Sequence, residues 1–235
     1  MSGVPQIHQI DRLDLHFAPK PWPFADERRA EIDAFFAEQM RLKPSMWNGR
    51  VLMLHRYEIA GGVFHGDYLE TDYASFSAWG RWGRPEAGIH DGFGAAALLS
   101  ADGAFLLGRM GEHTFNAGHI YFASGTPEPG DIVDGKVDME YNVRRELKEE
   151  TALDIDELVA ESGWTTVIDG GLIGHLKVLR SKENAEVLRA RILTEIRAEA
   201  EPELSDIVIV RSPADFDEAM PRFIRTFLAH HFTGR

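Results

Sequence analysis

One segment, Met139–Leu153 with the sequence MEYNVRRELKEETAL, constrains the fold more than any other part of the chain. Its apolar side chains recur every four residues, which places them on one side of a helix: Met139, Val143 and Leu147. Its acidic side chains lie three and four residues apart and share another side: Glu146, Glu149 and Glu150. We therefore expect a helix with one side against a core and an acidic side open to ligands.

The acidic side of this helix predicts a metal site. Three carboxylates next to one another repel, and a surface helix gains no stability from such a cluster unless a cation neutralises it. Carboxylate oxygens are hard ligands of the kind that Mg²⁺ and Mn²⁺ prefer. The spacing of Glu146, Glu149 and Glu150 thus indicates a divalent-metal site.

The same residues resemble a known motif. The run from Arg145 to Leu153, RELKEETAL, is similar to the core of the Nudix box, and Gly125 in SGTPEPG is similar to the glycine that opens it. The resemblance implies that the Gly125 carbonyl and the three glutamates hold Mg²⁺ or Mn²⁺, and that one glutamate takes a proton from the attacking water. It also implies that Arg145 orients the glutamates through ion pairs.

Two positions depart from the motif. The upstream acid of the box is Asp131 rather than glutamate, and the spacer after it is longer, so that Ile132–Lys136 with its Asp-Gly pair is interpreted as a short inserted turn. Whether Asp131 replaces the upstream glutamate stays open. Ala152 stands where the family has glycine, which costs about 1 kcal/mol if that residue adopts the left-handed conformation after the helix.

The order of strand-like and helix-like patterns favours an α/β (α+β) fold. The resemblance implies a Nudix α/β/α sandwich around a mixed sheet, with residues 91–235 as the Nudix domain and residues 1–90 as an N-terminal extension. In that extension we expect a helix at Ala25–Leu42 and two antiparallel strands at Arg50–Ile59 and Val63–Tyr68. In the later part we expect a hairpin over Gly92–Arg109, a strand at Thr114–Ala123 and a last helix that carries Phe216 to Leu228.

Aromatic and basic residues mix at the end of the extension. Asp67–Trp79 has no clean period, and the chain continues with Arg81, Trp82 and Arg84. Such residues, together with Arg109, suit contacts to a base and its phosphates, or alternatively form a hydrophobic seam with exposed arginines. The run DYLETDYASFSAW is also similar to the N-terminal region of mammalian Nudix enzymes that hydrolyse UDP-glucose, which points to a UDP-sugar-like substrate.

Further acids lie outside the box. Many members of the family use one such carboxylate, and Glu199, Glu201 and Glu203 precede the apolar strand at Ile207–Val210. We regard Glu201 and Glu203 as candidate additional acids at the site.

Charge and composition exclude several classes of function. The formal net charge of −13 disfavours binding to nucleic acid or to an anionic membrane surface. The absence of cysteine excludes disulfides, thiolate catalysis and cysteine-ligated zinc. No apolar run approaches the roughly 20 residues that span a bilayer, and no signal peptide is recognised, so we expect a cytoplasmic location.

Two functions remain on the sequence alone. The first is a Mg²⁺-dependent pyrophosphohydrolase that cleaves the diphosphate of a nucleoside diphosphate linked to another moiety, such as a UDP-sugar or ADP-ribose. The alternative is a non-catalytic Nudix-like module that binds a nucleotide metabolite as a sensor. The sequence leaves the oligomeric state open, and the resemblance makes a homodimer through the N-terminal extension one candidate, because the family often dimerises in this way.

Overall fold

The structure is a computed structural model that describes residues 3–44, 46–114 and 116–233, and its fold is mixed α/β. The α-helices are α1 (Pro23–Glu27), α2 (Arg29–Leu42), α3 (Tyr73–Arg81), α4 (Met139–Thr151), α5 (Ala185–Ile196) and α6 (Arg222–Thr233). The strands are β1 (Gln6–Ile10), β2 (Arg12–Phe17), β3 (Arg50–Ala60), β4 (Val63–Asp72), β5 (Asp91–Leu99), β6 (Phe105–Met110), β7 (Ile120–Tyr121), β8 (Ala123–Gly125), β9 (Ile132–Val133), β10 (Lys136–Val137), β11 (Val159–Ala160), β12 (Trp164–Asp169), β13 (Leu172–Arg180) and β14 (Leu204–Val210). No helix among these described residues is long and apolar enough to cross a membrane.

Contacts within the chain divide it into two compact units. Unit 1 holds the chain up to Asp11, residues 93–125 and the chain from Glu140 onward, and unit 2 holds residues 12–92 and 126–139. The division differs from a single boundary near residue 90, because β1 pairs with β12 of the later chain and the loop after Gly125 groups with the earlier chain. The two domains predicted from the sequence, 1–90 and 91–235, stay a prediction.

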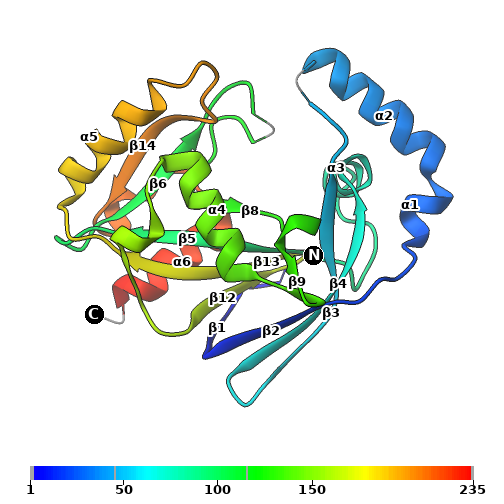
Figure 1. Ribbon diagram of the computed structural model, residues 1–235, viewed down its shortest axis with the longest axis horizontal. Helices are drawn as coiled ribbons and strands as arrows, with labels where there is room; N and C mark the ends of the chain where they lie inside the picture. The colour runs from blue at the N-terminus through cyan, green and yellow to red at the C-terminus, as the bar shows by residue number, and fades with distance from the viewer. Residues whose placement is uncertain (1–2, 45, 115, 234–235) are drawn as a thin grey trace. The chain divides into compact units, whose positions relative to one another are not determined.

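Unit 1 is built on one sheet with helices on both of its faces. Within the described residues its strands run in the order β1-β12-β13-β5-β6-β14, with β11, β7 and β8 added at β13, β6 and β5 (Figure 1). Alternate residues of a strand point to opposite faces, so the two faces can be followed along β5. Ala95, Ala97 and Leu99 pack with α6, whereas Ala96 and Leu98 line a small cavity with residues of α4 and α5. Unit 1 is therefore the α/β/α sandwich that the sequence predicts.

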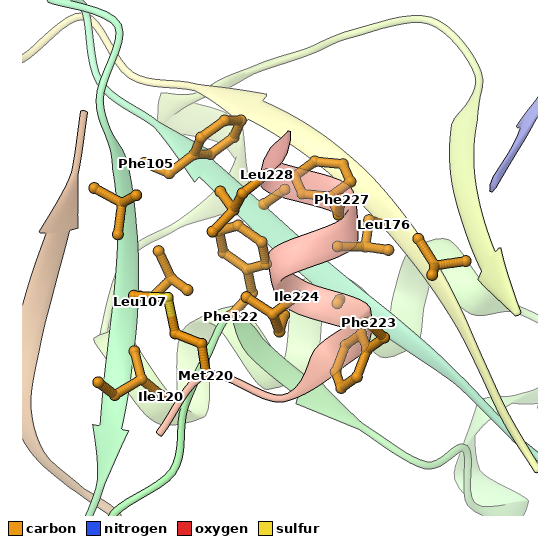
Figure 2. Packing of buried hydrophobic residues seen from close by; sticks show 14 of the residues in the cluster. Phe105, Leu107, Ile120, Phe122, Leu176, Met220, Phe223, Ile224, Phe227 and Leu228 are labelled. Atoms are coloured by element: carbon orange, nitrogen blue, oxygen red, sulfur yellow. The ribbon is translucent and has the colours of Figure 1, made fainter. Parts of the chain in front are cut away.

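The face toward α6 forms a hydrophobic cluster of unit 1. Phe223, Ile224 and Phe227 of α6 belong to this cluster, which also contains Phe105 and Phe122 (Figure 2). The rings of Phe105 and Phe122 lie nearly edge to face with the ring of Phe227, with centroids 5.6 and 5.5 Å apart. Edge-to-face packing of buried aromatic rings fixes the helix on the sheet.

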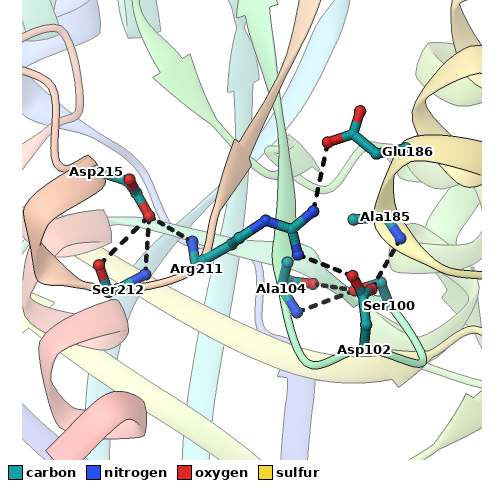
Figure 3. Close-up of polar contacts among 8 residues, drawn as sticks. All are labelled: Ser100, Asp102, Ala104, Ala185, Glu186, Arg211, Ser212 and Asp215. Atoms are coloured by element: carbon teal, nitrogen blue, oxygen red, sulfur yellow. Dashed lines mark hydrogen bonds and ion pairs between the residues drawn. The ribbon is translucent and has the colours of Figure 1, made fainter.

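Ion pairs join the residue after β14 to the turn between β5 and β6 and to α5. Arg211, just after β14, donates to Asp102 at 2.8 Å and reaches Glu186 of α5 at 3.4 Å (Figure 3). Asp102, in the turn between β5 and β6, also accepts from the backbone N–H of Ala185 at 2.8 Å and so caps α5. Hydrogen bonds, first of all from Ser100 and Arg211, hold the pKa of Asp102 below its usual range.

Unit 2 contains a second sheet and an aromatic cluster. Its described strands run in the order β3-β4-β2-β10-β9, with β2 parallel to β4 and the other pairs antiparallel. The parallel pair is possible because α1, α2 and β3 lie between β2 and β4 in the chain. Helices α1, α2 and α3 bury a cluster of large side chains, listed as Trp22, Phe24, Ile32, Phe36, Met53, Leu69 and Trp79.

Two sequence expectations in unit 2 need correction. The helix expected at Ala25–Leu42 is two helices, because the chain leaves the helical conformation at Arg28, whose φ and ψ are −105° and 18°. The segment Asp67–Trp79 is not irregular. It finishes β4 at Asp72, and the Asp72 carboxylate then accepts from the backbone N–H of Ser75 at 2.7 Å to begin α3.

Two elements of unit 1 are also shorter than predicted. The strand expected at Thr114–Ala123 is restricted to β7 and β8, because a turn with backbone bonds from Thr114 to Gly111 and from His119 to Asn116 precedes them. Phe115, within that predicted strand, lies outside the described residues. The last helix begins only at Arg222, after Pro221, so Phe216 and Met220 precede it.

Candidate metal-dependent active site

Helix α4 forms as the periodicity predicts. Met139, Val143 and Leu147 are buried, with exposed fractions of 3, 1 and 0%. The acidic positions differ among themselves, because Glu149 is exposed, Glu146 is half-buried and Glu150 is buried. The exposure of the three carboxylates on this face thus ranges from exposed to buried.

Arg145 contacts two of the glutamates. Its Nη1 atom lies 2.8 Å from Oε1 of Glu146 and 3.1 Å from Oε2 of Glu149. The arginine side chain is four-fifths buried, so its guanidinium is held in one place between the two carboxylates. The two ion pairs expected of Arg145 are thus present, and its role in orienting the glutamates stays a prediction.

Glu150 is the least exposed carboxylate of the box. Its Oε1 atom accepts a hydrogen bond from the backbone N–H of Ser124 at 3.0 Å. Within the part of the chain that the structure describes, its Oε2 atom is buried without a hydrogen-bond partner. Burial, followed by repulsion from Glu146, Glu203 and Glu149, raises the pKa of Glu150 well above its ordinary value.

Gly125 gives the Glu146 carboxylate its space. A Cβ atom at position 125 would lie 2.0 Å from Oε1 of Glu146, so the Glu146 carboxylate would have to move to admit it. Gly125 ends β8, whose pairing with Gly94 of β5 fixes its backbone in the sheet. The absence of a side chain therefore brings the backbone at residue 125 directly against the acidic face of α4.

The loop after Gly125 contains the turn predicted at Asp134-Gly135, and whether it is an insertion stays a prediction. Strands β9 and β10 pair as a hairpin, and its two turn residues have positive φ, 50° at Asp134 and 76° at Gly135. Asp131 is fully buried, and its carboxylate accepts from the backbone N–H of Glu128 at 2.9 Å. That contact gives Asp131 a role in the shape of the loop.

Ala152 ends the helix in the left-handed conformation, with φ of 58°. Its backbone N–H donates to the carbonyl of Lys148 at 2.9 Å, and its own carbonyl accepts from the Lys148 ammonium at 3.0 Å. Ala152 thus adopts the left-handed conformation that was considered for this position and that glycine adopts without strain.

Of the two candidate additional acids, Glu203 is the one whose charge acts on Glu150. It directly precedes β14, its carbonyl accepts from the backbone N–H of Gly111 at 2.7 Å, and its charge raises the pKa of Glu150. Glu201 is exposed in the preceding turn. A role for either residue stays a prediction.

The candidate substrate residues fall into both units. In unit 2, Trp82 packs on Phe24 and lies 4.1 Å below the guanidinium of Arg28, while Arg81 and Arg84 are exposed. In unit 1, Arg109 of β6 reaches Asp217 at 3.4 Å and the carbonyl of Gly118 at 3.5 Å. Trp82 thus belongs to an aromatic cluster, and substrate contacts by any of these residues stay a prediction.

Sequence reasoning missed the contributions of the backbone. Ser124 supplies the N–H that holds Glu150, yet a backbone group leaves no trace in the identity of the residue. Asp91 was also missed. Its carboxylate accepts from the Thr126 hydroxyl at 2.9 Å, in the loop directly after Gly125.

The residues of the box fit a divalent cation. In the described ranges, no three histidine, aspartate or glutamate side chains are already gathered closely enough to hold a metal. The buried oxygen of Glu150 nevertheless lacks a partner, and three further carboxylates repel it. A hard cation would satisfy both conditions, because it coordinates carboxylate oxygens and offsets their charge.

Comparisons with known proteins give similarities of structure. No family model and no curated protein matches the chain. Among solved structures, it is similar to the Nudix hydrolase RenU of M. smegmatis, with 13% identity, a TM-score of 0.41 and coverage of 62% of this chain and 86% of that one. It is also similar to the MutT protein of Methanosarcina mazei Go1, with 20% identity, a TM-score of 0.39 and coverage of 62% and 94%.

A third similar structure is a C. elegans Ap4A hydrolase in a binary complex, with 15% identity, a TM-score of 0.39 and coverage of 61% of this chain and 99% of that one. These three comparisons are similarities of fold. Because these three TM-scores are below 0.5, the likenesses assign no substrate, metal or activity to this chain.

Proposed function

We propose that the protein is a Nudix-type pyrophosphohydrolase that requires Mg²⁺ or Mn²⁺. It cleaves the diphosphate linkage of a nucleoside diphosphate joined to another moiety. The observation that carries the proposal is the buried carboxylate oxygen of Glu150, which has no hydrogen-bond partner and is repelled by Glu146 and Glu149. The backbone of Gly125 lies directly against the Glu146 carboxylate, because residue 125 has no side chain.

Each residue of the box has a proposed task. Glu146, Glu149 and Glu150, with the carbonyl of Gly125, would hold the cation, and Glu203 is the candidate for a further carboxylate. When bound, the cation neutralises the negative charge of the diphosphate and lowers the pKa of its bound water. Arg145 keeps Glu146 and Glu149 in place. A glutamate of the box accepts the proton of the attacking water, and a nucleoside monophosphate or a sugar phosphate leaves.

The experiment is a panel assay with Mg²⁺. UDP-sugars, ADP-ribose, dinucleoside polyphosphates and coenzyme A are incubated with the protein, and the products are separated and identified. We expect product from at least one compound, dependent on Mg²⁺ and abolished by Glu149→Gln in a variant with an unchanged circular dichroism spectrum. Equal turnover by this variant and the wild type would overturn the assignment of the box.

One observation favours a second function. Arg145 already pairs with two of the three glutamates, so part of the acidic face is neutralised within the chain. A non-catalytic module that binds a nucleotide metabolite as a sensor is therefore the alternative. Such a module would bind the nucleotide in EDTA and release no product over hours, whereas the hydrolase needs Mg²⁺ for turnover. Calorimetric titration of the nucleotide with and without Mg²⁺ separates the two.

A further inference from the structure

One end of the sheet in unit 1 carries side chains to which the proposed function assigns no task. Strand β5 pairs with β8 at Gly94 and Gly125, and with β6 at Leu98 and Leu106. Because β5 and β6 are antiparallel, the chain from Leu106 to Met110 runs back alongside β5 toward Gly94. The end of β6 therefore lies at the same end of the sheet as Gly125, the proposed glycine ligand.

Glu203 belongs to this end of the sheet as well. Leu204, the first residue of β14, pairs with Met110, the last residue of β6. One residue further, the carbonyl of Glu203 accepts from the backbone N–H of Gly111 at 2.7 Å. The charge of Glu203 in turn repels that of Glu150 in the box. The loop that follows β6 thus begins beside a carboxylate that lies within electrostatic reach of the proposed metal ligands.

The ring of His113 lies against the first residue of this loop. A Cβ atom at Gly111 would lie 3.0 Å from Cε1 and 3.1 Å from Nδ1 of His113, and 3.1 Å from the carbonyl oxygen of Glu203. The hydroxyl of Thr114 donates to the carbonyl of Gly111 at 2.8 Å and so holds the turn that brings the ring back. His113, which is exposed, is therefore a neighbour of Glu203.

A diphosphate at this site needs hydrogen-bond donors. The carboxylates of Glu146 and Glu149 are acceptors and repel phosphate oxygens, and the guanidinium of Arg145 already pairs with both of them. A cation offsets the negative charge but donates no hydrogen bond. An imidazole carries at least one N–H donor in either protonation state. His113 supplies such a donor next to Glu203.

We propose that His113 is a substrate-binding residue that donates an N–H hydrogen bond to a phosphate oxygen of the substrate. It holds the diphosphate at the end of β6, whereas the glutamates of α4 hold the cation. The contact adds affinity for the phosphates and takes no part in metal binding. The inference rests on the proposed hydrolase function and assigns the substrate side of the site to the loop after β6.

Three variants test the contact. His113→Ala removes the imidazole, and His113→Gln replaces it with an amide that keeps an N–H donor. The matched control is His119→Ala, which removes a second exposed imidazole of the same loop, whose Nδ1 lies 3.1 Å from the carbonyl oxygen of Asn116. The probe is methylenediphosphonate, a diphosphate analogue that water does not cleave, titrated by calorimetry in the presence of Mn²⁺.

We expect His113→Ala to bind the probe about tenfold more weakly than the wild type, the equivalent of one hydrogen bond to a charged group. His113→Gln and His119→Ala should bind it nearly as the wild type does. Mn²⁺ affinity without the probe, measured by electron paramagnetic resonance, should be the same in all four proteins.

Three results would overturn the contact. The first is wild-type affinity of His113→Ala for the probe. The second is a loss of Mn²⁺ affinity in the same variant, since His113 would then belong to the metal site. The third is an equal loss of probe affinity in His113→Ala and His119→Ala, which would indicate a general effect on the loop.

Turnover separates this inference from the proposed function. With the best substrate of the panel, we expect His113→Ala to raise KM and to leave kcat near the wild-type value. A wild type that binds the probe through His113 but releases no product would contradict the hydrolase and retain the contact. Normal turnover with the same KM in the wild type and His113→Ala would retain the hydrolase and contradict the contact.

Discussion

At the scale of single residues, the most demanding position is Gly125. Its backbone is fixed by pairing with Gly94, and the Glu146 carboxylate occupies the place where a Cβ atom would lie. A glycine is needed here for space, since its φ does not fall in the left-handed region. The absence of a side chain at residue 125 therefore lets the Glu146 carboxylate of α4 lie against this strand of the sheet.

Gly125→Ala should therefore displace the Glu146 side chain and weaken metal binding. Gly130→Ala, in the same loop, is the control, because an added Cβ there would meet only the Glu128 carboxylate at an ordinary 3.4 Å. Titration of Mn²⁺ into both variants checks the expectation. Equal Mn²⁺ affinities of the two variants would show that metal binding does not depend on the absence of a side chain at residue 125.

Ala152 offers a test in the opposite direction. Its φ of 58° is unfavourable for alanine and neutral for glycine. Ala152→Gly should raise the free energy of unfolding by about 1 kcal/mol, measured by urea denaturation. A loss of stability would mean that the contacts of the Ala152 side chain outweigh its backbone strain.

Asp91 predicts a dependence of stability on pH. Burial, opposed by the hydrogen bond from Thr126 and by the charge of Arg84, raises the pKa of Asp91 to about 6. The pKa of this carboxyl in the folded state is above the value of about 4 in the unfolded chain, so the folded state holds its proton over a pH range in which the unfolded chain has lost it. The contribution of Asp91 to stability is therefore present below pH 4 and is lost as the pH rises to about 6.

The check is urea denaturation of wild type and Asp91→Asn across this range. The difference in unfolding free energy between the two should change between about pH 4 and pH 6 by up to about 3 kcal/mol, and should be constant above it. A constant difference throughout would place the carboxyl in contact with water.

At the scale of elements, α3 is a helix that the periodicity of the sequence does not reveal. The run after Asp67 has no clean period because β4 ends and α3 begins within it. Asp72 marks the change, since it caps the helix through Ser75 and also accepts from Arg29 at 2.7 Å. The capping signal was present in the sequence, but the aromatic residues around it obscured the helix.

Asp72→Ala should lower the free energy of unfolding by about 1 kcal/mol through loss of the cap. Asp72→Asn is the matched control, because its amide oxygen can still accept from Ser75 while the ion pair with Arg29 is lost. We expect the asparagine variant to retain most of the stability in urea. Equal losses in the two variants would assign the stabilisation to the ion pair instead.

At the scale of the whole molecule, local patterns were predicted better than pairings between distant segments. The buried face of α4 with Val143 and Leu147 was predicted from its period, and the turn between β9 and β10 was predicted from the Asp134-Gly135 pair. The sequence could not show that β1 pairs with β12 or that the hairpin of β9 and β10 joins β2, because strand pairing depends on partners far along the chain. The orientation of the Glu150 oxygen likewise depends on Ser124 in another strand.

The central claim is that the acidic face of α4 holds the cation that makes the protein a hydrolase. Its most direct test is the rate of product release from the best substrate of the panel, measured over a series of Mg²⁺ concentrations. Glu150→Gln is compared with Glu140→Gln, an exposed position in the first turn of the same helix. The account predicts that Glu140→Gln follows the wild-type Mg²⁺ curve, while Glu150→Gln loses about a hundredfold or more in rate. Mg²⁺-dependent turnover by Glu150→Gln at the wild-type rate would contradict it.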